Sequence, residues 1–205
     1  MLSTKNIIVQ KHARIFLSKP VNQEDEVWIL FHGYAQNMNE FYNSFTNKEF
    51  TTRCFIIPEG LSRFYQKGMS GNVGASWMTK EERDLEIIDQ QNYLNQIIEH
   101  FNLNSRQINI FAFSQGAATV ARWISESDLN IKKLIFWSGN IPDQILSNKQ
   151  HVLWNYHPHF FIGKEDQFTS KASWARFTNQ LNQNMFTFYE GDHFFTPKLI
   201  TKYIL

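Results

Sequence analysis

The fold of this 205-residue chain is decided by the segment Ile108-Asn-Ile-Phe-Ala-Phe113-Ser114-Gln-Gly116, followed by Ala-Ala-Thr-Val-Ala-Arg-Trp-Ile-Ser125. Residues 108–113 are typical of a buried strand, and residues 115–126 have the period of an amphipathic helix. Ser114 stands between them in a small-x-Ser-x-small pattern, with Ala112 and Gly116 as the small residues. A sharp strand-to-helix turn needs small residues there, and it lifts the serine hydroxyl clear of the sheet. The segment therefore predicts a nucleophilic serine at the carboxyl end of a strand.

Strand-like runs alternate with helical patterns along the rest of the chain. Strands are expected at residues 6–10, 13–17, 26–31, 53–57, 108–113, 133–137, about 157–163 and 185–189. This alternation predicts an α/β fold, with a mostly parallel sheet covered by helices on both faces. One domain over residues 1–205, without a separate cap domain, is expected from the length and the absence of a linker. Residues 58–77 have no period and contain four glycines, which predicts a long loop that sets specificity.

Composition excludes several classes of protein. Twenty basic against nineteen acidic residues give a net charge of +1, which does not support nucleic-acid binding or a polybasic membrane anchor. No apolar stretch reaches the length of a membrane span. A single cysteine, Cys54, excludes an intramolecular disulfide and a multi-cysteine metal site. The first ten residues lack the apolar core of a signal peptide, so a cytoplasmic location is expected.

The predicted nucleophile needs a general base and an acid that orients it. His193 follows the last predicted strand and Asp166 follows the preceding one, so both belong at the same sheet edge as Ser114. The acid would hold the tautomer of His193 and stabilise its cation. Glu165 is the alternative to Asp166, since it is adjacent in the sequence.

Two backbone N–H groups are candidates for an oxyanion hole. Gln115 opens the helix after the serine, where free N–H groups and the helix dipole stabilise negative charge. Gly33 permits a turn after the strand at residues 26–31, which would direct the N–H of Tyr34 toward a substrate carbonyl.

Four segments in order resemble the α/β-hydrolase superfamily: Phe31-His-Gly33, Phe113-Ser-Gln-Gly116, Gly163-Lys-Glu-Asp166 and Gly191-Asp-His193. Within it, the resemblance is to the carboxylesterase, phospholipase and acyl-protein thioesterase family, over about residues 27–193. It implies hydrolysis of a small-molecule ester through an acyl-enzyme, without metal or organic cofactor. Ala112, where these proteins usually have glycine, is the main departure in the serine motif.

Aromatic residues make up 16% of the chain, with 19 phenylalanines. Trp77, Phe168 and Phe194 are expected to line an apolar substrate site together with Gly33. The first hypothesis is a serine esterase of small to medium apolar esters. The second is an acyl thioesterase or a lysophospholipase for longer chains, and the third is a non-catalytic binding protein with the hydrolase fold. The sequence predicts neither the acyl and alcohol groups nor the oligomeric state.

Overall fold

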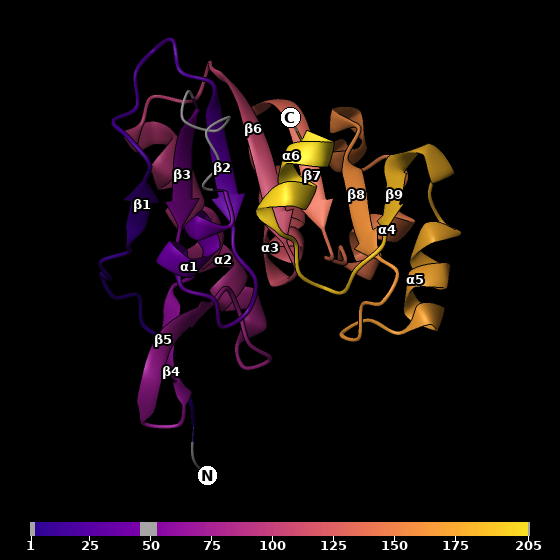
Figure 1. Cartoon of the computed structure of the whole chain (residues 1–205). Helices are drawn as coiled ribbons and strands as arrows, with labels where there is room; N and C mark the ends of the chain where they lie inside the picture. The colour runs from indigo at the N-terminus through magenta and orange to yellow at the C-terminus, as the bar shows by residue number, and fades with distance from the viewer. Residues whose placement is uncertain (1–2, 46–52, 205) are drawn as a thin grey trace.

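The computed structural model describes residues 3–45 and 53–204, and it is built around a seven-stranded sheet (Figure 1). The spatial order of the strands is β1-β3-β2-β6-β7-β8-β9. Among the described strands of this sheet, only β1 is antiparallel to its neighbour, so the expected mostly parallel sheet is confirmed. The strands are β1 (Ile15–Leu17), β2 (Val27–Phe31), β3 (Cys54–Pro58), β6 (Gln107–Phe113), β7 (Asn130–Trp137), β8 (His159–Gly163) and β9 (Phe186–Tyr189).

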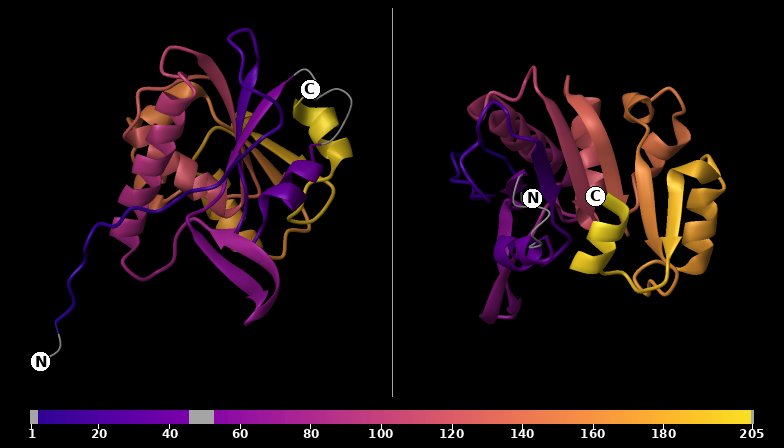
Figure 2. Two further views of the ribbon diagram at one scale, coloured as in Figure 1. Left: turned by 90° about the vertical axis from the view of Figure 1, so that its left-hand side faces the viewer. Right: turned by 45° about the horizontal axis from the view of Figure 1, so that its top comes forward.

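Helices cover both faces of this sheet, as Figure 2 shows. One face packs against α2 (Arg83–His100), α3 (Gln115–Ser125), α4 (Asp143–Ser147), α5 (Lys171–Thr178) and the 3₁₀ helix Val152–Tyr156, with a further 3₁₀ turn at Gln183–Met185. The other face packs against α1 (Met38–Asn43) and α6 (Pro197–Ile204). The sheet is therefore buried on both sides, as parallel sheets require.

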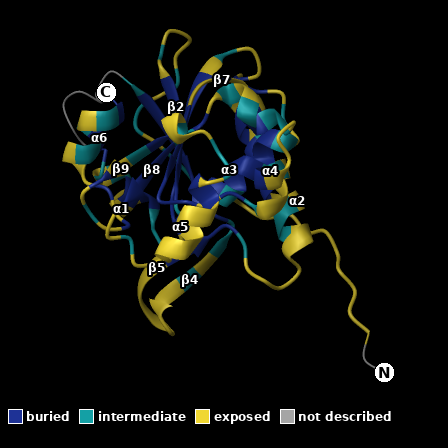
Figure 3. Cartoon of the chain, turned by 90° about the vertical axis from the view of Figure 1, so that its right-hand side faces the viewer, coloured by how far each residue is buried: buried dark blue, intermediate teal, exposed yellow. Residues whose placement is uncertain are grey.

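The alternation of side chains along β2 shows how the sequence builds two cores. Val27, Ile29 and Phe31 pack in one core, and Trp28 and Leu30 pack in the other. All five residues are buried, which explains why the strand reads as a continuous apolar run. Figure 3 shows the buried sheet between partly exposed helices. The polar residues next to β2 are those at its two ends, Glu26 before the strand and His32 after it.

The expected loop at residues 58–77 is wrong. It contains an antiparallel hairpin of β4 (Ser62–Lys67) and β5 (Ser70–Ser76), which projects from the body of the molecule (Figure 1). Its glycines and exposed polar residues hid the strand pattern, because a two-stranded ribbon has no core face to impose alternation. The strand expected at residues 6–10 is also wrong: this segment is irregular and exposed.

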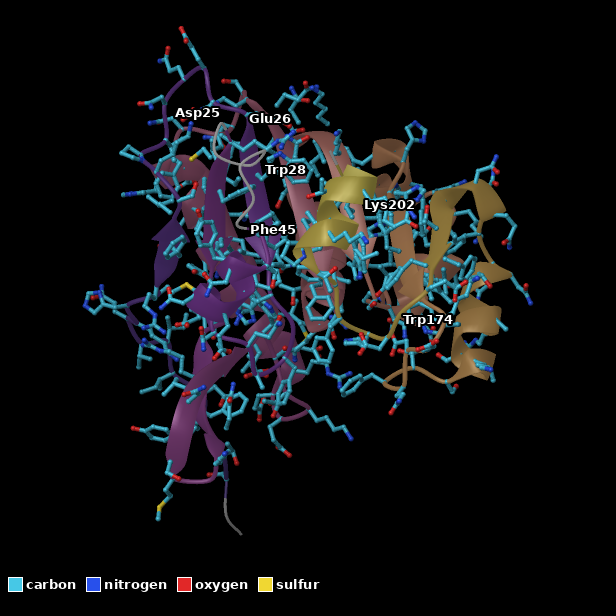
Figure 4. The ribbon with its side chains drawn as sticks, in the orientation of Figure 1. Asp25, Glu26, Trp28, Phe45, Trp174 and Lys202 are labelled. Atoms are coloured by element: carbon cyan, nitrogen blue, oxygen red, sulfur yellow. The ribbon has the colours of Figure 1, made fainter. Side chains whose placement is uncertain are left out.

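A polar cluster fastens the amino end of β2, far from the end where the strand points (Figure 4). The indole N–H of Trp28 donates to Glu26 at 3.1 Å, and Asp25 pairs with Lys19 at 2.6 Å. The candidate site lies at the opposite edge of the sheet, at the carboxyl ends of β2, β6, β8 and β9. Within residues 3–45 and 53–204, no helix has the length and apolar character needed to cross a membrane.

Candidate active site

Ser114 occupies a strained turn between β6 and α3. Its backbone has φ 52° and ψ −117°, a conformation that residues other than glycine seldom adopt. Its N–H donates to the carbonyl of Trp137 at 2.9 Å, which fixes the turn to β7. A Cβ on Gly116 would lie 2.9 Å from the carbonyl oxygen of His32, so only glycine fits there. The surrounding packing therefore holds the serine hydroxyl out at the carboxyl edge of the sheet.

The predicted serine, histidine and aspartate lie in one hydrogen-bonded series. His193 Nε2 is 2.9 Å from Ser114 Oγ, and His193 Nδ1 is 2.8 Å from Asp166 Oδ2. The other oxygen of Asp166 accepts from the backbone N–H of Phe168 at 2.8 Å and of Thr169 at 3.3 Å. A carboxylate can only accept, so the Nδ1 proton points at Asp166 and Nε2 is left to accept from the serine. This arrangement can remove the proton of the hydroxyl during attack.

The series is shielded from water on the side of the acid. The side chain of Asp166 is fully buried and that of His193 is 8% exposed. Glu165, the alternative acid, is exposed, and its backbone N–H donates to the carbonyl of Gly191 at 2.9 Å. Glu165 thus helps, through its backbone, to hold residues 190–196, which carry His193 and are called the histidine loop below. Asp166 is the carboxylate that contacts the imidazole.

A buried tyrosine under the histidine loop was not singled out by the sequence. The hydroxyl of Tyr189 accepts from Trp137 Nε1 at 2.9 Å and donates to the carbonyl of Asp192 at 2.8 Å. Burial raises the pKa of Tyr189, so the hydroxyl stays neutral and keeps its proton for Asp192. Its place, the last residue of β9 four positions before His193, is the only sequence signal that could have identified it.

The loop after β2 is held so that one N–H stays available. His32 Nε2 accepts from the N–H of Gly60 at 3.0 Å, so Nδ1 carries the proton and donates to the carbonyl of Gly33 at 2.7 Å. That carbonyl and the N–H of Tyr34 belong to one trans peptide, so they point in opposite directions. The N–H of Gly33 donates to Gln36 Oε1 at 2.7 Å. Within the described residues the N–H of Tyr34 has no partner, which suits it to an oxyanion.

Complete burial of His32 lowers its pKa to about 4. Desolvation is the main cause, because the charged imidazolium is disfavoured where water is excluded. His32 is therefore neutral near pH 7, and the neutral ring is the form that can both accept from Gly60 and donate to Gly33.

The β4–β5 hairpin braces the same loop. The N–H of Ala35 donates to the carbonyl of Ala75 at 2.9 Å, and the N–H of Ala75 donates back to the carbonyl of Gln36 at 3.1 Å. Gln66 Nε2 donates to the carbonyl of Ala35 at 2.6 Å. Ala35 has a φ of 62°, and these three bonds hold it there. The hairpin is thus a structural part of the loop that carries Tyr34.

Trp77 was expected to contact substrate, and the structure places it elsewhere. Its side chain is completely buried, stacked on the ring of His32 with centroids 4.8 Å apart. Its indole N–H donates to the carbonyl of His32 at 2.8 Å. The expectation failed because Trp77 directly follows β5, and the hairpin places its side chain in the core beneath the loop.

Gln115 contributes in two ways. It is the first residue of α3, and its backbone N–H has no partner within the described residues. Its side chain accepts from the N–H of Trp77 at 3.1 Å and donates to the carbonyl of Met78 at 2.9 Å. The backbone N–H therefore lies next to Ser114 in the chain, while the side chain fixes the segment after the hairpin by hydrogen bonds. The sequence did not indicate this second role.

The remaining predicted site residues divide between surface and interior. Phe168 is 72% and Phe194 50% exposed, and their ring centroids lie 4.7 and 5.5 Å from that of His193. Tyr34 presents its ring to solvent 5.3 Å from the ring of Phe64. Gly33 is buried and its φ is not positive, so the expected turn reserved for glycine is wrong; a Cβ there would lie 2.9 Å from the ring of Phe113, and close packing is what favours glycine.

Most of this chain matches a known protein family. The model of the family described as serine hydrolase (FSH1) matches residues 23–200. The curated proteins give no match.

Solved structures share the fold. Acyl-protein thioesterase 2 from Zea mays has a TM-score of 0.65 at 15% identity, over 93% of this chain and 96% of that one. The Bacillus cereus carboxylesterase has a TM-score of 0.61 at 15% identity, over 93% and 91%. Esterase PE8 has a TM-score of 0.62 at 14% identity, over 93% and 95%. At such low identities the TM-scores show a common fold, that of the α/β-hydrolases, and not a common function. With a family match that covers all but the ends of the sequence, the chain belongs to the FSH1 serine hydrolase family.

Proposed function

We propose that the protein hydrolyses carboxylic esters with small to medium apolar groups, through an acyl-enzyme on Ser114. The observation that carries the proposal is the continuous series from Ser114 Oγ through His193 to Asp166, with contacts of 2.9 and 2.8 Å. The N–H groups of Tyr34 and Gln115, which have no partner in the part of the chain that the structure describes, support it as an oxyanion hole.

Acylation begins with attack of Ser114 Oγ on the ester carbonyl carbon. His193 Nε2 takes the hydroxyl proton, and the carbonyl oxygen becomes an oxyanion held by the N–H groups of Tyr34 and Gln115. One such donor is typically worth about 2.7–4 kcal/mol of transition-state stabilisation. Asp166 stabilises the imidazolium that forms. His193 then gives the proton to the leaving oxygen, and the C–O bond to the alcohol breaks.

Deacylation repeats these steps with water as the nucleophile. His193 takes a proton from the water while its oxygen attacks the acyl carbon, and the same N–H groups hold the second oxyanion. Collapse of this intermediate returns the proton to Ser114 Oγ and releases the carboxylic acid. The alcohol has already left, so deacylation depends on the acyl group alone.

A fluorophosphonate probe and an aryl acetate test the assignment. We expect the wild type to be labelled and to hydrolyse the ester, and Ser114→Ala to lose both. Ser125→Ala is a matched control, because Ser125 Oγ lies 2.9 Å from His151 Nε2. The other nitrogen of His151 accepts from the N–H of Leu153 at 3.1 Å, so Nε2 carries the proton and cannot take one from Ser125. Ester hydrolysis that survives in Ser114→Ala would reject the proposal.

The acyl thioesterase and lysophospholipase alternative uses the same residues with another substrate. The shared fold with a Zea mays acyl-protein thioesterase supports testing it. Oxygen esters and thioesters of equal acyl length, compared by kcat/KM, separate the two substrates. A non-catalytic binding protein would instead leave Ser114 unlabelled by the probe.

A further inference from the structure

We propose that Phe168 and Phe194 form the binding site for the leaving alcohol, so that the enzyme favours esters of aromatic or bulky apolar alcohols. The inference rests on the proposed function and adds to it the side of His193 on which the alcohol half of the ester lies. It assigns the two exposed phenylalanines to one half of the ester.

The chemistry of the leaving group gives the first step. His193 Nε2 must protonate the alcohol oxygen as the C–O bond breaks, so that oxygen has to lie within hydrogen-bond reach of the imidazole. Whatever is bonded to the oxygen then extends past the ring of His193. Side chains that surround this ring are therefore the ones that meet the alcohol.

The rings around His193 give the second step. Phe168 is tilted at 47° with its centroid 4.7 Å away, and Phe194 stands at 90° to the imidazole at 5.5 Å. The two phenyl rings meet edge to face at 6.1 Å. They form two walls of a corner that has the catalytic imidazole as its third side. An aromatic or branched alcohol would bury apolar ring surface that now faces water.

Both rings are carried on backbone that is already fixed. The N–H of Phe168 donates to Asp166 Oδ1 at 2.8 Å, and the N–H of Phe194 donates to Asp192 Oδ1 at 2.9 Å. An alcohol that binds against residues with a fixed backbone loses less conformational entropy than one that must first order a mobile loop. The carboxylate that orients His193 thus also positions one wall of the corner.

The sheet order separates this corner from Tyr34, one of the two proposed oxyanion donors. Ser114 follows β6; Tyr34 follows the neighbouring strand β2 on one side, while Phe168 and Phe194 follow β8 and β9 on the other. The views in Figure 1 and Figure 2 show the ends of β2 and of β8–β9 on opposite sides of β6. The leaving alcohol and the N–H of Tyr34 therefore lie on opposite sides of Ser114, as the separate oxygens of the tetrahedral intermediate require.

The test compares two esters that share an acetyl group, phenyl acetate and methyl acetate. In Phe168→Ala/Phe194→Ala we expect the ratio of their kcat/KM values to fall about tenfold relative to wild type, from the loss of two ring contacts. Intrinsic reactivity of the esters cancels in this comparison. The deacylation rate constant of the acetyl-enzyme should not change, because the alcohol is absent from that step. The ratio of the kcat/KM values of phenyl acetate and phenyl butyrate should not change either.

Phe188→Ala is the matched control, because Phe188 is 45% exposed on β9 and takes no part in the site. The proposal would be overturned if kcat/KM fell equally for both acetates in the double variant. A changed deacylation rate constant, or a changed kcat/KM ratio between phenyl acetate and phenyl butyrate, would also overturn it. The single variant Phe168→Ala keeps the test open if the double variant is unstable, and it should show part of the same shift. A wild type that the fluorophosphonate does not label would instead count against the proposed function itself.

Discussion

Replacing Gly163 by alanine is expected to cut catalysis with little loss of folded protein. Gly163 ends β8, directly beneath the loop that carries His193. A Cβ there would lie 2.7 Å from the carbonyl oxygen of Gly191 and 2.9 Å from the carbonyl carbon of Asp192, and closer still to the oxygen of Asp192. Ordinary contacts begin at 3.4 Å, and backbone atoms cannot swing aside as a flexible side chain can. The histidine loop must therefore move outward as a unit.

The size of this movement gives the expected effect. A displacement of about 1 Å is enough to cost about 100-fold in rate, or about 2.7 kcal/mol of transition-state stabilisation. The contact between His193 Nε2 and Ser114 Oγ is 2.9 Å, so such a shift takes it beyond hydrogen-bond reach. Overpacking of this kind lowers the free energy of unfolding by about 1–3 kcal/mol.

The assay is kcat/KM on phenyl acetate, with urea unfolding of the same preparation to confirm the folded fraction. Gly68→Ala is the matched control, since Gly68 has a φ of +60° but open space around it. That variant should lose about 1–2 kcal/mol of stability through backbone strain and keep its activity. Activity of Gly163→Ala within threefold of the wild type would refute the idea that this close approach sets the position of His193.

Three other outcomes are expected. The free energy of unfolding should fall by about 3 kcal/mol as the pH drops from about 6.5 toward 4, because His32 binds a proton in the unfolded state but, with its pKa of about 4, stays neutral in the folded state. A urea midpoint that does not change over this range, or the same pH dependence in His32→Gln, would contradict it. Tyr189→Phe leaves the carbonyl of Asp192 unpaired, which should lower the unfolding free energy by about 1–3 kcal/mol and kcat severalfold; unchanged kcat would show that the hydroxyl does not position the loop. Trp77→Phe removes the donor to the carbonyl of His32 and should cost about 1–3 kcal/mol of stability, while a changed KM for small esters would return Trp77 to the substrate site.

The parts of the site that the sequence predicted are those fixed by local pattern and strand direction. Ser114, Asp166 and His193 each follow a strand of one parallel sheet, so topology alone brings them to one edge. The strand runs could be read because every residue of β2 and β3 is buried, which leaves an uninterrupted apolar signal.

The parts that the sequence missed depend on contacts between distant segments. Trp77 looks like the end of a loop, and only the hairpin places it against His32. The side chain of Gln115 reaches Trp77 and Met78, nearly forty positions away in the chain. No pattern in the sequence around Gln115 indicates these contacts. Tyr189 has the pattern of one more apolar strand residue, and only the structure shows its hydroxyl between the end of β7 and the carbonyl of Asp192.

The bonds between the hairpin and the loop of Tyr34 constrain how this enzyme could be re-engineered. Specificity is often altered by transplanting surface segments, and residues 62–76 look like an obvious segment to exchange. Ala75 and Gln66 hold Ala35 and Gln36, so removing the whole ribbon would also displace the N–H of Tyr34, the proposed oxyanion donor. A library should therefore randomise only the tip, residues 68–71, and keep the base of the ribbon as an invariant graft point.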